Sequence, residues 1–323
     1  MSEPQSAFVA RSEALWAALE TELDDLESRS RPPSADFPVR YRRVCQHLAL
    51  ARARLYAPAL IDRLNTIAAR GHHQLYQGGA VSTLVLRGLM HTFPARVRAE
   101  WRLVLVAGVL FYGALAAMVW ALHVEPSLVH SVFDAETIAN YEAMYDASSD
   151  QFLRERAADS DILMFGFYVR NNTGIGLKTF ASGLLAGLGT LFILVFNGVS
   201  IGATLGHLHN VGHGGTVFPF IIGHSALELT AIHLSGVAGL RLGLGVLTPG
   251  QHRRQDAVAM AARQALPIVL GMGAMFIFAA FIEAFWSSRH TLSDGVRYGV
   301  GGTLWLLVGG YFLLAGRWSS DAS

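Results

Sequence analysis

Long apolar runs fill the chain after about residue 102, whereas apolar residues before that point recur at helical spacing among charged ones. The run from Leu103 to about Val124 is long enough to cross a hydrocarbon core of roughly 30 Å, since an α-helix rises 1.5 Å per residue. Later apolar runs lie at about 184–205, 217–240, 265–286 and 298–314. The pattern predicts an all-α fold, a polytopic helical membrane bundle of about five apolar segments within residues 102–318.

Residues 1–101 are expected to form a helical cytoplasmic domain. Three amphipathic patterns predict its helices: one around Trp16, one beginning near Tyr41, and one from about Pro58 to Tyr76, where Gly78-Gly79 ends it. Residues 80–100 are basic and amphipathic, so we expect a helix at the cytoplasmic surface that leads into the membrane. The arginines of the second helix either form a solvated face or attract anionic headgroups; they are Arg40, Arg42, Arg43, Arg52 and Arg54.

The distribution of charge predicts which ends of the apolar segments face the cytoplasm. Arginines precede the first span and acids dominate residues 125–172, so the positive-inside rule places the N-terminus in the cytoplasm and this loop outside. A single crossing by residues 217–240 would then put Arg253 and Arg254 outside. Either that segment is broken or re-entrant near Gly223-His224, which we favour, or the Gly-rich stretch from residue 174 makes two passes.

The Gly-rich stretch itself, from about residue 171 to residue 208, is longer than one span needs. We expect a short, tilted or partly interfacial helix that contains Lys178, followed by the crossing. Gly183 and Gly187 have the spacing of a small-residue helix contact.

Composition narrows the class of protein. Hydrophobic residues make up 52% of the chain and charged residues 15%, and the formal net charge of +1 argues against nucleic acid as a partner. Cys45 is the single cysteine, so a disulfide framework and a Cys-based metal site are excluded. No Walker A loop occurs, and the serines of the apolar runs, Ser182, Ser200, Ser225 and Ser235, are interpreted as small residues of packed membrane helices. We therefore expect no cofactor and no catalytic residues.

A polar centre is predicted in the segment FPFIIGHSALELTAIHLSGVAGLR, which begins at Phe218. His224 and Glu228 are four residues apart, on one helical face. A glutamate in the middle of a bilayer costs roughly 2.5 kcal/mol, so it is seldom kept there without a partner or a function. We expect a structural hydrogen bond between the two, with a proton or ion pathway as the alternative. Asn197 is expected to bond between helices, and Glu283 to be an interfacial carboxylate beside the aromatic belt.

A cluster of histidines makes a metal site conceivable. Imidazole and carboxylate groups bind zinc in sets of three or four. The spacing argues against a metal site: no HExxH motif occurs, and His233 lies about 140° around the helix from Glu228. We therefore predict no metal, and the weak candidates are His207, His209, His213, His224 and Glu228.

Five motifs resemble the stage II sporulation protein M family of bacterial integral membrane proteins, in its longer, non-sporulating form. They are SAFVARSEALW, YRRVCQHLALARA, NNTGIGLKTFASGLLAGLGTLFILVFNG, FIIGHSALELTAIHLSGVAGLRLG and ALPIVLGMGAMFIFAAFIEAFWS. The GHxxxE and EAFW elements, preceded by Asn-Asn and Asn-Gly, are the most specific. The family-motif positions singled out are Asn171, Asn172, Gly198, Gly223 and Arg241.

The resemblance implies a multi-pass protein of the bacterial inner (cytoplasmic) membrane. Relatives in spore formers anchor a peptidoglycan-degrading complex, and others are often encoded beside AAA-type ATPases. The long N-terminal domain departs from the sporulation form, and no catalytic set is carried over. Expected partners are the lipid bilayer, other membrane or cell-envelope proteins, an AAA-type ATPase system and further copies of the chain.

The leading hypothesis is a non-enzymatic membrane scaffold whose polar centre fixes the packing of the bundle. The alternative is a transporter or channel subunit in which His224, Glu228 and Asn197 line a pathway. An intramembrane metal-dependent hydrolase is a weaker alternative.

Overall fold

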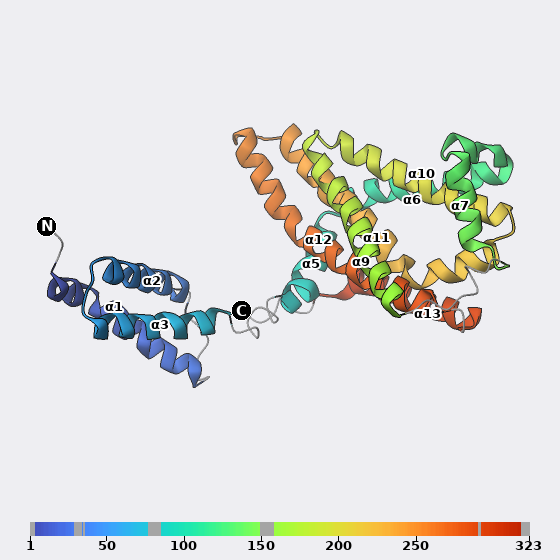
Figure 1. Ribbon diagram of the computed structural model, residues 1–323. Coiled ribbons are helices and arrows are strands. Elements are labelled where there is room, and N and C mark those ends of the chain that lie inside the picture. Colours follow the sequence, from blue (N-terminus) through green and yellow to red (C-terminus); the bar gives the residue numbers. More distant parts are fainter. Residues whose placement is uncertain are drawn as a thin grey trace. The chain divides into compact units, whose positions relative to one another are not determined.

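The computed structural model describes residues 4–28, 34, 36–76, 85–148, 158–289 and 292–317. Within these ranges every regular element is a helix, which confirms the all-α prediction. The chain divides into two compact units, residues 1–86 and 87–323, and each is described by itself (Figure 1).

The first unit contains three helices, α1 (Gln5–Glu27), α2 (Phe37–Ala53) and α3 (Pro58–Tyr76). Their apolar faces meet in one core, because apolar residues recur every three or four positions along each helix. The largest buried side chains are Phe8, Trp16, Leu19, Leu23, Phe37, Leu64 and Ile67. The helices expected at these positions are confirmed, and α3 has the predicted bounds.

Ion pairs connect the helices of the first unit around its core. Arg63 of α3 contacts Glu13 and Glu20 of α1, both at 2.8 Å. The hydrogen bond from Arg63 lowers the pKa of Glu13 below its ordinary value. Of the α2 arginines, Arg40 contacts Glu22 at 3.2 Å, so part of the expected basic face is neutralised within the unit.

The second unit is a helical bundle. Among the residues that the structure describes, four helices are long and apolar enough to cross a membrane. They are α6 (Trp101–Val124), α10 (Leu188–Asn210), α11 (Gly214–Leu247), and α12 (Arg254–Ile282) with its π-helical extension η4 (Glu283–Ser287). Two further helices, α9 (Ala158–Ala181) and α13 (Asp294–Leu314), pack against α11. The predicted membrane bundle is confirmed.

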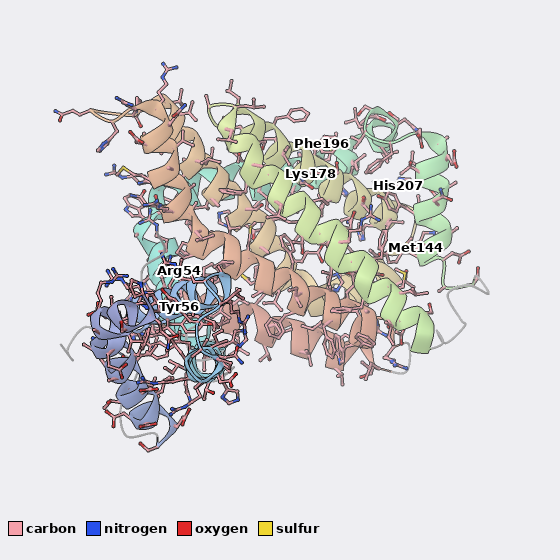
Figure 2. The ribbon with its side chains drawn as sticks, turned by 60° about the vertical axis from the view of Figure 1, so that its left-hand side comes forward. Arg54, Tyr56, Met144, Lys178, Phe196 and His207 are labelled. Atoms are coloured by element: carbon pink, nitrogen blue, oxygen red, sulfur yellow. The ribbon has the colours of Figure 1, made fainter. Side chains whose placement is uncertain are left out.

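The outward faces of these helices carry large apolar side chains, as lipid contact requires. Val109 is 72% exposed, Phe192 70% and Leu306 79%. Phe196 of α10 is also exposed (Figure 2). Because such a surface is unstable in water, these faces support the assignment to a membrane.

Helix α11 is the central helix of the bundle. It is the most buried of the four membrane-length helices and packs against α6, α9, α10, α12 and α13. It is continuous from Gly214 to Leu247, so the break or re-entrant turn expected near Gly223-His224 is wrong. Pro219 lies within the first two turns of α11, and neighbouring helices enclose the residues around it. The helix therefore tolerates the loss of the one backbone hydrogen bond that proline cannot donate.

Contacts between α6 and α10 show that these two helices run in the same direction. A Cβ added to Gly198 would meet Phe111, one added to Gly202 would meet Leu115, and one added to Gly206 would meet Leu122. The residue numbers of the paired positions rise together along both helices, so α6 and α10 are parallel and lie side by side (Figure 1). The chain between them must therefore run back along the bundle.

Helix α9 makes this return. Its Asp161 lies 3.4 Å from Arg289, just after η4, and its Gly176 faces Phe276 of α12, so α9 runs antiparallel to α12 over most of its length. At 24 residues it is about 36 Å long. The outer loop was expected to extend to residue 172, but the chain is helical from residue 158. The short helix expected around Lys178 is instead part of this 24-residue helix.

A short hairpin follows α6. It consists of η2 (Pro126–Ser131) and α7 (Ala135–Tyr145) and packs on the end of α10. Asp134 caps α7 by accepting a hydrogen bond from the Thr137 amide at 2.8 Å, which lowers the pKa of the Asp134 carboxyl. Thr216 of α11 donates to the Tyr145 carbonyl at 2.6 Å, which connects α7 to α11.

In the basic segment before the first span, residues 85–87 are α-helical; the π-helix η1 (Gly88–Thr92) and α5 (Phe93–Ala99) follow. Phe93 is 2% exposed and contacts Gly271 of α12 and Phe312 of α13. Arg98 donates to the Phe312 carbonyl at 2.8 Å. The segment is therefore packed into the helical bundle of the second unit; of the expected surface helix, residues 80–84 lie outside the described residues.

Candidate functional site

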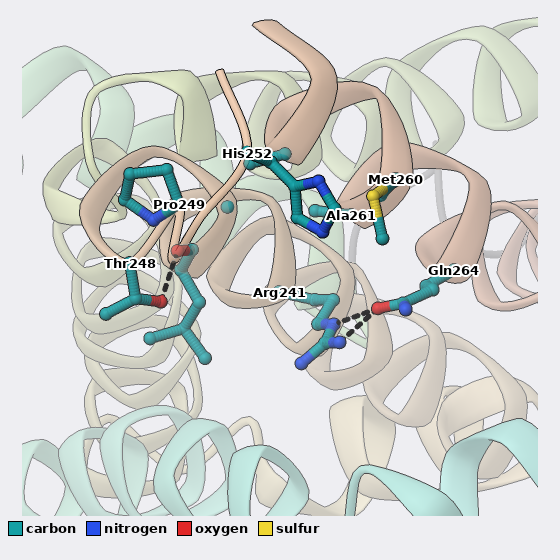
Figure 3. A pocket seen from close by; sticks show the side chains of 10 residues that line it. Arg241, Thr248, Pro249, His252, Met260, Ala261 and Gln264 are labelled. Carbon is teal, nitrogen blue, oxygen red and sulfur yellow. Dashed lines mark hydrogen bonds between the residues drawn. The ribbon is translucent and has the colours of Figure 1, made fainter. Parts of the chain in front are cut away.

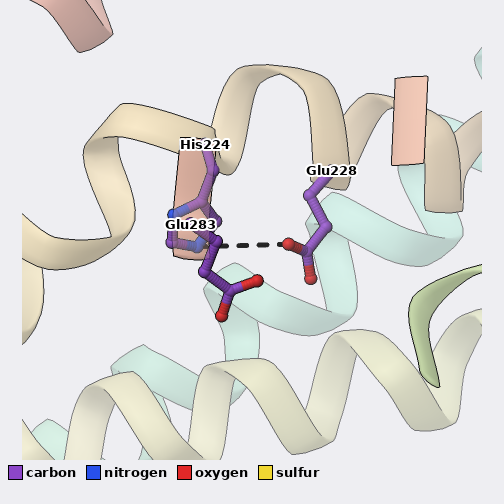
Figure 4. A group of neighbouring side chains, drawn as sticks. All are labelled: His224, Glu228 and Glu283. Atoms are coloured by element: carbon purple, nitrogen blue, oxygen red, sulfur yellow. Dashed lines mark ion pairs between the residues drawn. The ribbon is translucent and has the colours of Figure 1, made fainter. Parts of the chain in front are cut away.

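Three side chains converge inside the second unit: His224 and Glu228 of α11, and Glu283 of η4 (Figure 4). One nitrogen or oxygen atom of each lies within 4.8 Å of the others. His224 is 6% exposed and Glu283 9%, while the Glu228 side chain is 20% exposed. We call these three residues the His-Glu-Glu cluster.

The π-helical turn η4 positions the third member. A π-turn holds more residues than an α-turn, so Glu283 and Ser287, four residues apart, both face α11. Ser287 Oγ lies 3.1 Å from His224 Nδ1 and holds the imidazole ring. Gly223 makes this approach possible: a Cβ there would lie 2.3 Å from the Trp286 ring.

One expectation about these residues is wrong, and one stays a prediction. His224 Nε2 and Glu228 Oε2 are 4.0 Å apart, too far for the expected hydrogen bond. Glu283 is 9% exposed and faces α11, so it is enclosed by protein; its expected position near the membrane interface stays a prediction. Sequence reasoning missed Ser287; the available signal was its i, i+4 spacing from Glu283, which repeats the spacing of His224 and Glu228.

Asn197 does not join the cluster. Its side chain donates to the Ile193 carbonyl at 2.8 Å, one turn back on α10, so the expected bond between helices is wrong. A helical asparagine can bond to its own backbone whenever no neighbouring group competes.

The other histidines lie elsewhere. His207 contacts Glu142 of α7 at 2.7 Å (Figure 2), and His209 packs on Phe218. His213 precedes the first residue of α11. His233 lies 2.8 Å from the Val104 carbonyl of α6, away from the His-Glu-Glu cluster as the helical angle predicted. Of the weak metal candidates, the structure therefore brings only His224 and Glu228 into a described group of three potential metal ligands.

A second polar group surrounds Arg241, near the other end of α11. Arg241 contacts Glu100 at 3.3 Å and Gln264 at 2.7 Å, and Glu100 also contacts Arg96 at 2.5 Å. A pocket of about 180 Å³ lies beside Arg241, between α11 and α12, and His252 is among its lining residues (Figure 3). Because Glu100 and Gln264 already bind the Arg241 guanidinium, we interpret this group as structural.

The remaining family-motif positions have packing roles. Asn172 is 7% exposed and accepts a hydrogen bond from Asn171 at 3.0 Å. Gly198 allows the backbone of α6 to approach α10. Gly183 faces Gly239 of α11, but Gly187 has a φ of 82° and precedes α10, so the two do not form one helical face.

Comparison with known families agrees with this architecture. The family model for stage II sporulation protein M (SpoIIM) matches residues 103–288, which include most of α6 and all of α9, α10, α11, α12 and η4. The chain belongs to the SpoIIM family. All three residues of the His-Glu-Glu cluster lie within the SpoIIM match.

The helices of the first unit precede the SpoIIM match. A second family model, described as a domain of unknown function (DUF8413), matches residues 6–77. No curated protein and no solved structure matches the chain significantly.

Proposed function

We propose that this SpoIIM-family chain is a multi-pass protein of the bacterial inner membrane with its N-terminus in the cytoplasm. The alternating directions of α6, α9, α10, α11, α12 and α13 support a membrane pass by each of them. This order returns Arg253 and Arg254 to the side on which α6 begins. It removes the conflict with the positive-inside rule, since both arginines then share the cytoplasm with the basic segment of α5.

Within that membrane the chain acts as a non-enzymatic scaffold for other membrane or cell-envelope proteins. The observation that carries this proposal is the first unit, a helical bundle with its own core and its own ion pairs, attached to a membrane bundle. A bundle of this kind offers a surface for a partner without needing an active site.

A particular surface of the first unit is suited to a partner. Val39, Leu50 and Leu55 are 51%, 40% and 89% exposed, and all belong to α2 or directly follow it. Exposed apolar groups of this kind lose contact with water when a protein docks. An AAA-type ATPase system is the partner class that we propose for this cytoplasmic face.

A second candidate function is a transporter or channel subunit. It is favoured by the convergence of two carboxylates and one imidazole in the interior of the bundle. Ionisable groups at that depth are common along substrate and ion pathways.

Cross-linking in the native host tests the scaffold. The full chain should retain specific membrane or ATPase partners, and Leu50→Asp with Leu55→Asp should reduce their recovery at least fivefold. Thr66→Asp, at an exposed position of α3, is the matched control. The scaffold is refuted if the double variant recovers the same partners, or if Glu228→Gln abolishes function while every partner remains bound.

A further inference from the structure

We propose that His224, Glu228 and Glu283 bind a divalent transition-metal ion of the zinc class inside the bundle. This inference goes beyond the scaffold function and does not depend on it. Zinc accepts neutral imidazole nitrogen and carboxylate oxygen, and three protein ligands leave a fourth position for water or substrate. One histidine and two glutamates are such a set, and they come from two helices that are antiparallel.

The spacing of the ligand atoms is close to what a metal requires. Three atoms at about 2.1 Å from one zinc ion are about 3.4 Å apart in a tetrahedron. His224 Nε2 and Glu228 Oε2 are 4.0 Å apart, and the whole set lies within 4.8 Å. A glutamate has three side-chain torsions, so rotation of Glu228 and Glu283 closes the difference without moving either helix.

The orientation of the imidazole also fits a ligand. Metal-binding histidines usually use one ring nitrogen for the metal and the other for a hydrogen bond that fixes the ring. Here Nδ1 lies 3.1 Å from Ser287 Oγ, which leaves Nε2 toward Glu228. Ser287 is 1% exposed, so water does not compete for this contact. We assign Ser287 as a positioning residue.

Glu228 gives an independent indication that a cation belongs in the cluster. Its Oε2 atom is shielded from solvent and accepts no hydrogen bond in the described part of the chain. A buried carboxylate oxygen without a donor is costly, and a bound cation removes that cost. The guanidinium of Arg297 does not serve this purpose, since it donates to the carbonyls of Ser287, Arg289 and Leu292.

The cluster lies toward the end of the bundle that carries the hairpin. Tyr145 of α7 contacts Phe220, with ring centroids 5.9 Å apart, and Phe220 contacts His224 at 5.4 Å. His224 is ten residues, about 15 Å, from the start of α11. In the proposed topology a metal ion would therefore enter from the outer side of the membrane.

Zinc binding to the full-length, tag-free protein in detergent tests this site. After stripping with a chelator, the protein is titrated with Zn²⁺ in competition with a chromophoric chelator, and bound metal is counted by mass spectrometry. We expect one tightly held zinc ion per chain. Glu228→Gln and Glu283→Gln should each weaken binding at least tenfold, because the amides keep the shape but not the charge, and Ser287→Ala about tenfold.

The matched control is Glu142→Gln, which changes a carboxylate that also contacts a histidine, His207, but lies on α7. It should leave zinc affinity unchanged. Near-ultraviolet circular dichroism establishes that each variant is folded, and zinc-dependent thermal stabilisation of the unaltered chain gives a readout that needs no variant.

Three results overturn the proposal. One is a folded wild-type chain that gains neither bound zinc nor thermal stability in excess Zn²⁺. Another is zinc that is retained by Glu228→Gln but lost from Glu142→Gln. The third is an increase in stability of both Gln variants without any change in bound metal, which would show that the carboxylates hold a proton and no metal.

Discussion

Replacement of Gly198 by alanine tests the close approach of α6 and α10. A Cβ at this position would lie 2.4 Å from the Phe111 carbonyl oxygen and 3.0 Å from the Ala114 Cβ. A backbone oxygen has no torsion by which it can move away, so the two helices must separate by at least about 0.6 Å. Gly202, one turn further, faces Leu115 in the same way and would lose its contact too.

The magnitude follows from two opposing effects. Overpacking of a tightly packed contact costs typically about 1–3 kcal/mol. Alanine is favoured over glycine in a helix by about 1 kcal/mol, which offsets part of this cost. We expect Gly198→Ala to lower the free energy of unfolding by up to about 2 kcal/mol, which is the overpacking cost less the gain in helix propensity. Gly113→Ala is the control, since a Cβ at Gly113 of α6 meets no atom within 4 Å, and this variant should be as stable as the wild type or more stable.

Unfolding in mixed micelles measures the difference. The full chain in a mild detergent is titrated with sodium dodecyl sulfate, and helix content is followed by circular dichroism. The Gly198→Ala chain should unfold at a lower fraction of dodecyl sulfate than the Gly113→Ala chain. Equal midpoints for the two variants would refute the close, parallel packing of α6 and α10.

Two further predictions concern topology and pH. In a Cys45→Ser background, an impermeant maleimide added to intact cells should label Ser131→Cys but not Arg253→Cys; labelling at position 253 would contradict the proposed passes. Burial lowers the pKa of His47 below its ordinary 6.5, and Trp16 Nε1 donates to His47 Nδ1 at 3.0 Å. The folded state therefore binds fewer protons, so this contribution to stability is present above about pH 6.5 and is lost as pH falls through the folded pKa. The protection factors of the α1–α3 amides, that is, the intrinsic exchange rate at each pH divided by the observed rate, should be higher at about pH 7.5 than at about pH 5, and His47→Asn, which does not titrate, should remove this difference.

Helix α9 shows why apolar content alone did not reveal every helix of the bundle. Asp161 and Arg170 interrupt its apolar pattern. Inside the bundle Asp161 is 2% exposed and contacts Arg289, so an ion pair across 128 positions of the sequence compensates the buried charge. A hydropathy pattern does not contain that partner.

The sequence by itself determined the helical class, the membrane-length apolar segments and the apolar faces that form the core of the first unit. These depend on local physics: helical spacing sets which residues share a face, and the thickness of the hydrocarbon core sets the length of a span. His224 and Glu228 were also predicted to share a face, because four residues make about one helical turn.

Only the tertiary structure decided what surrounds that face. Glu283 is 55 positions from Glu228, and the π-helical turn η4 brings it to His224 together with Ser287. Such a meeting depends on the register between α11 and α12, which the contact of Gly223 with Trp286 holds. Helix register is set by the packing of many side chains at once, so no local pattern in the sequence specifies it.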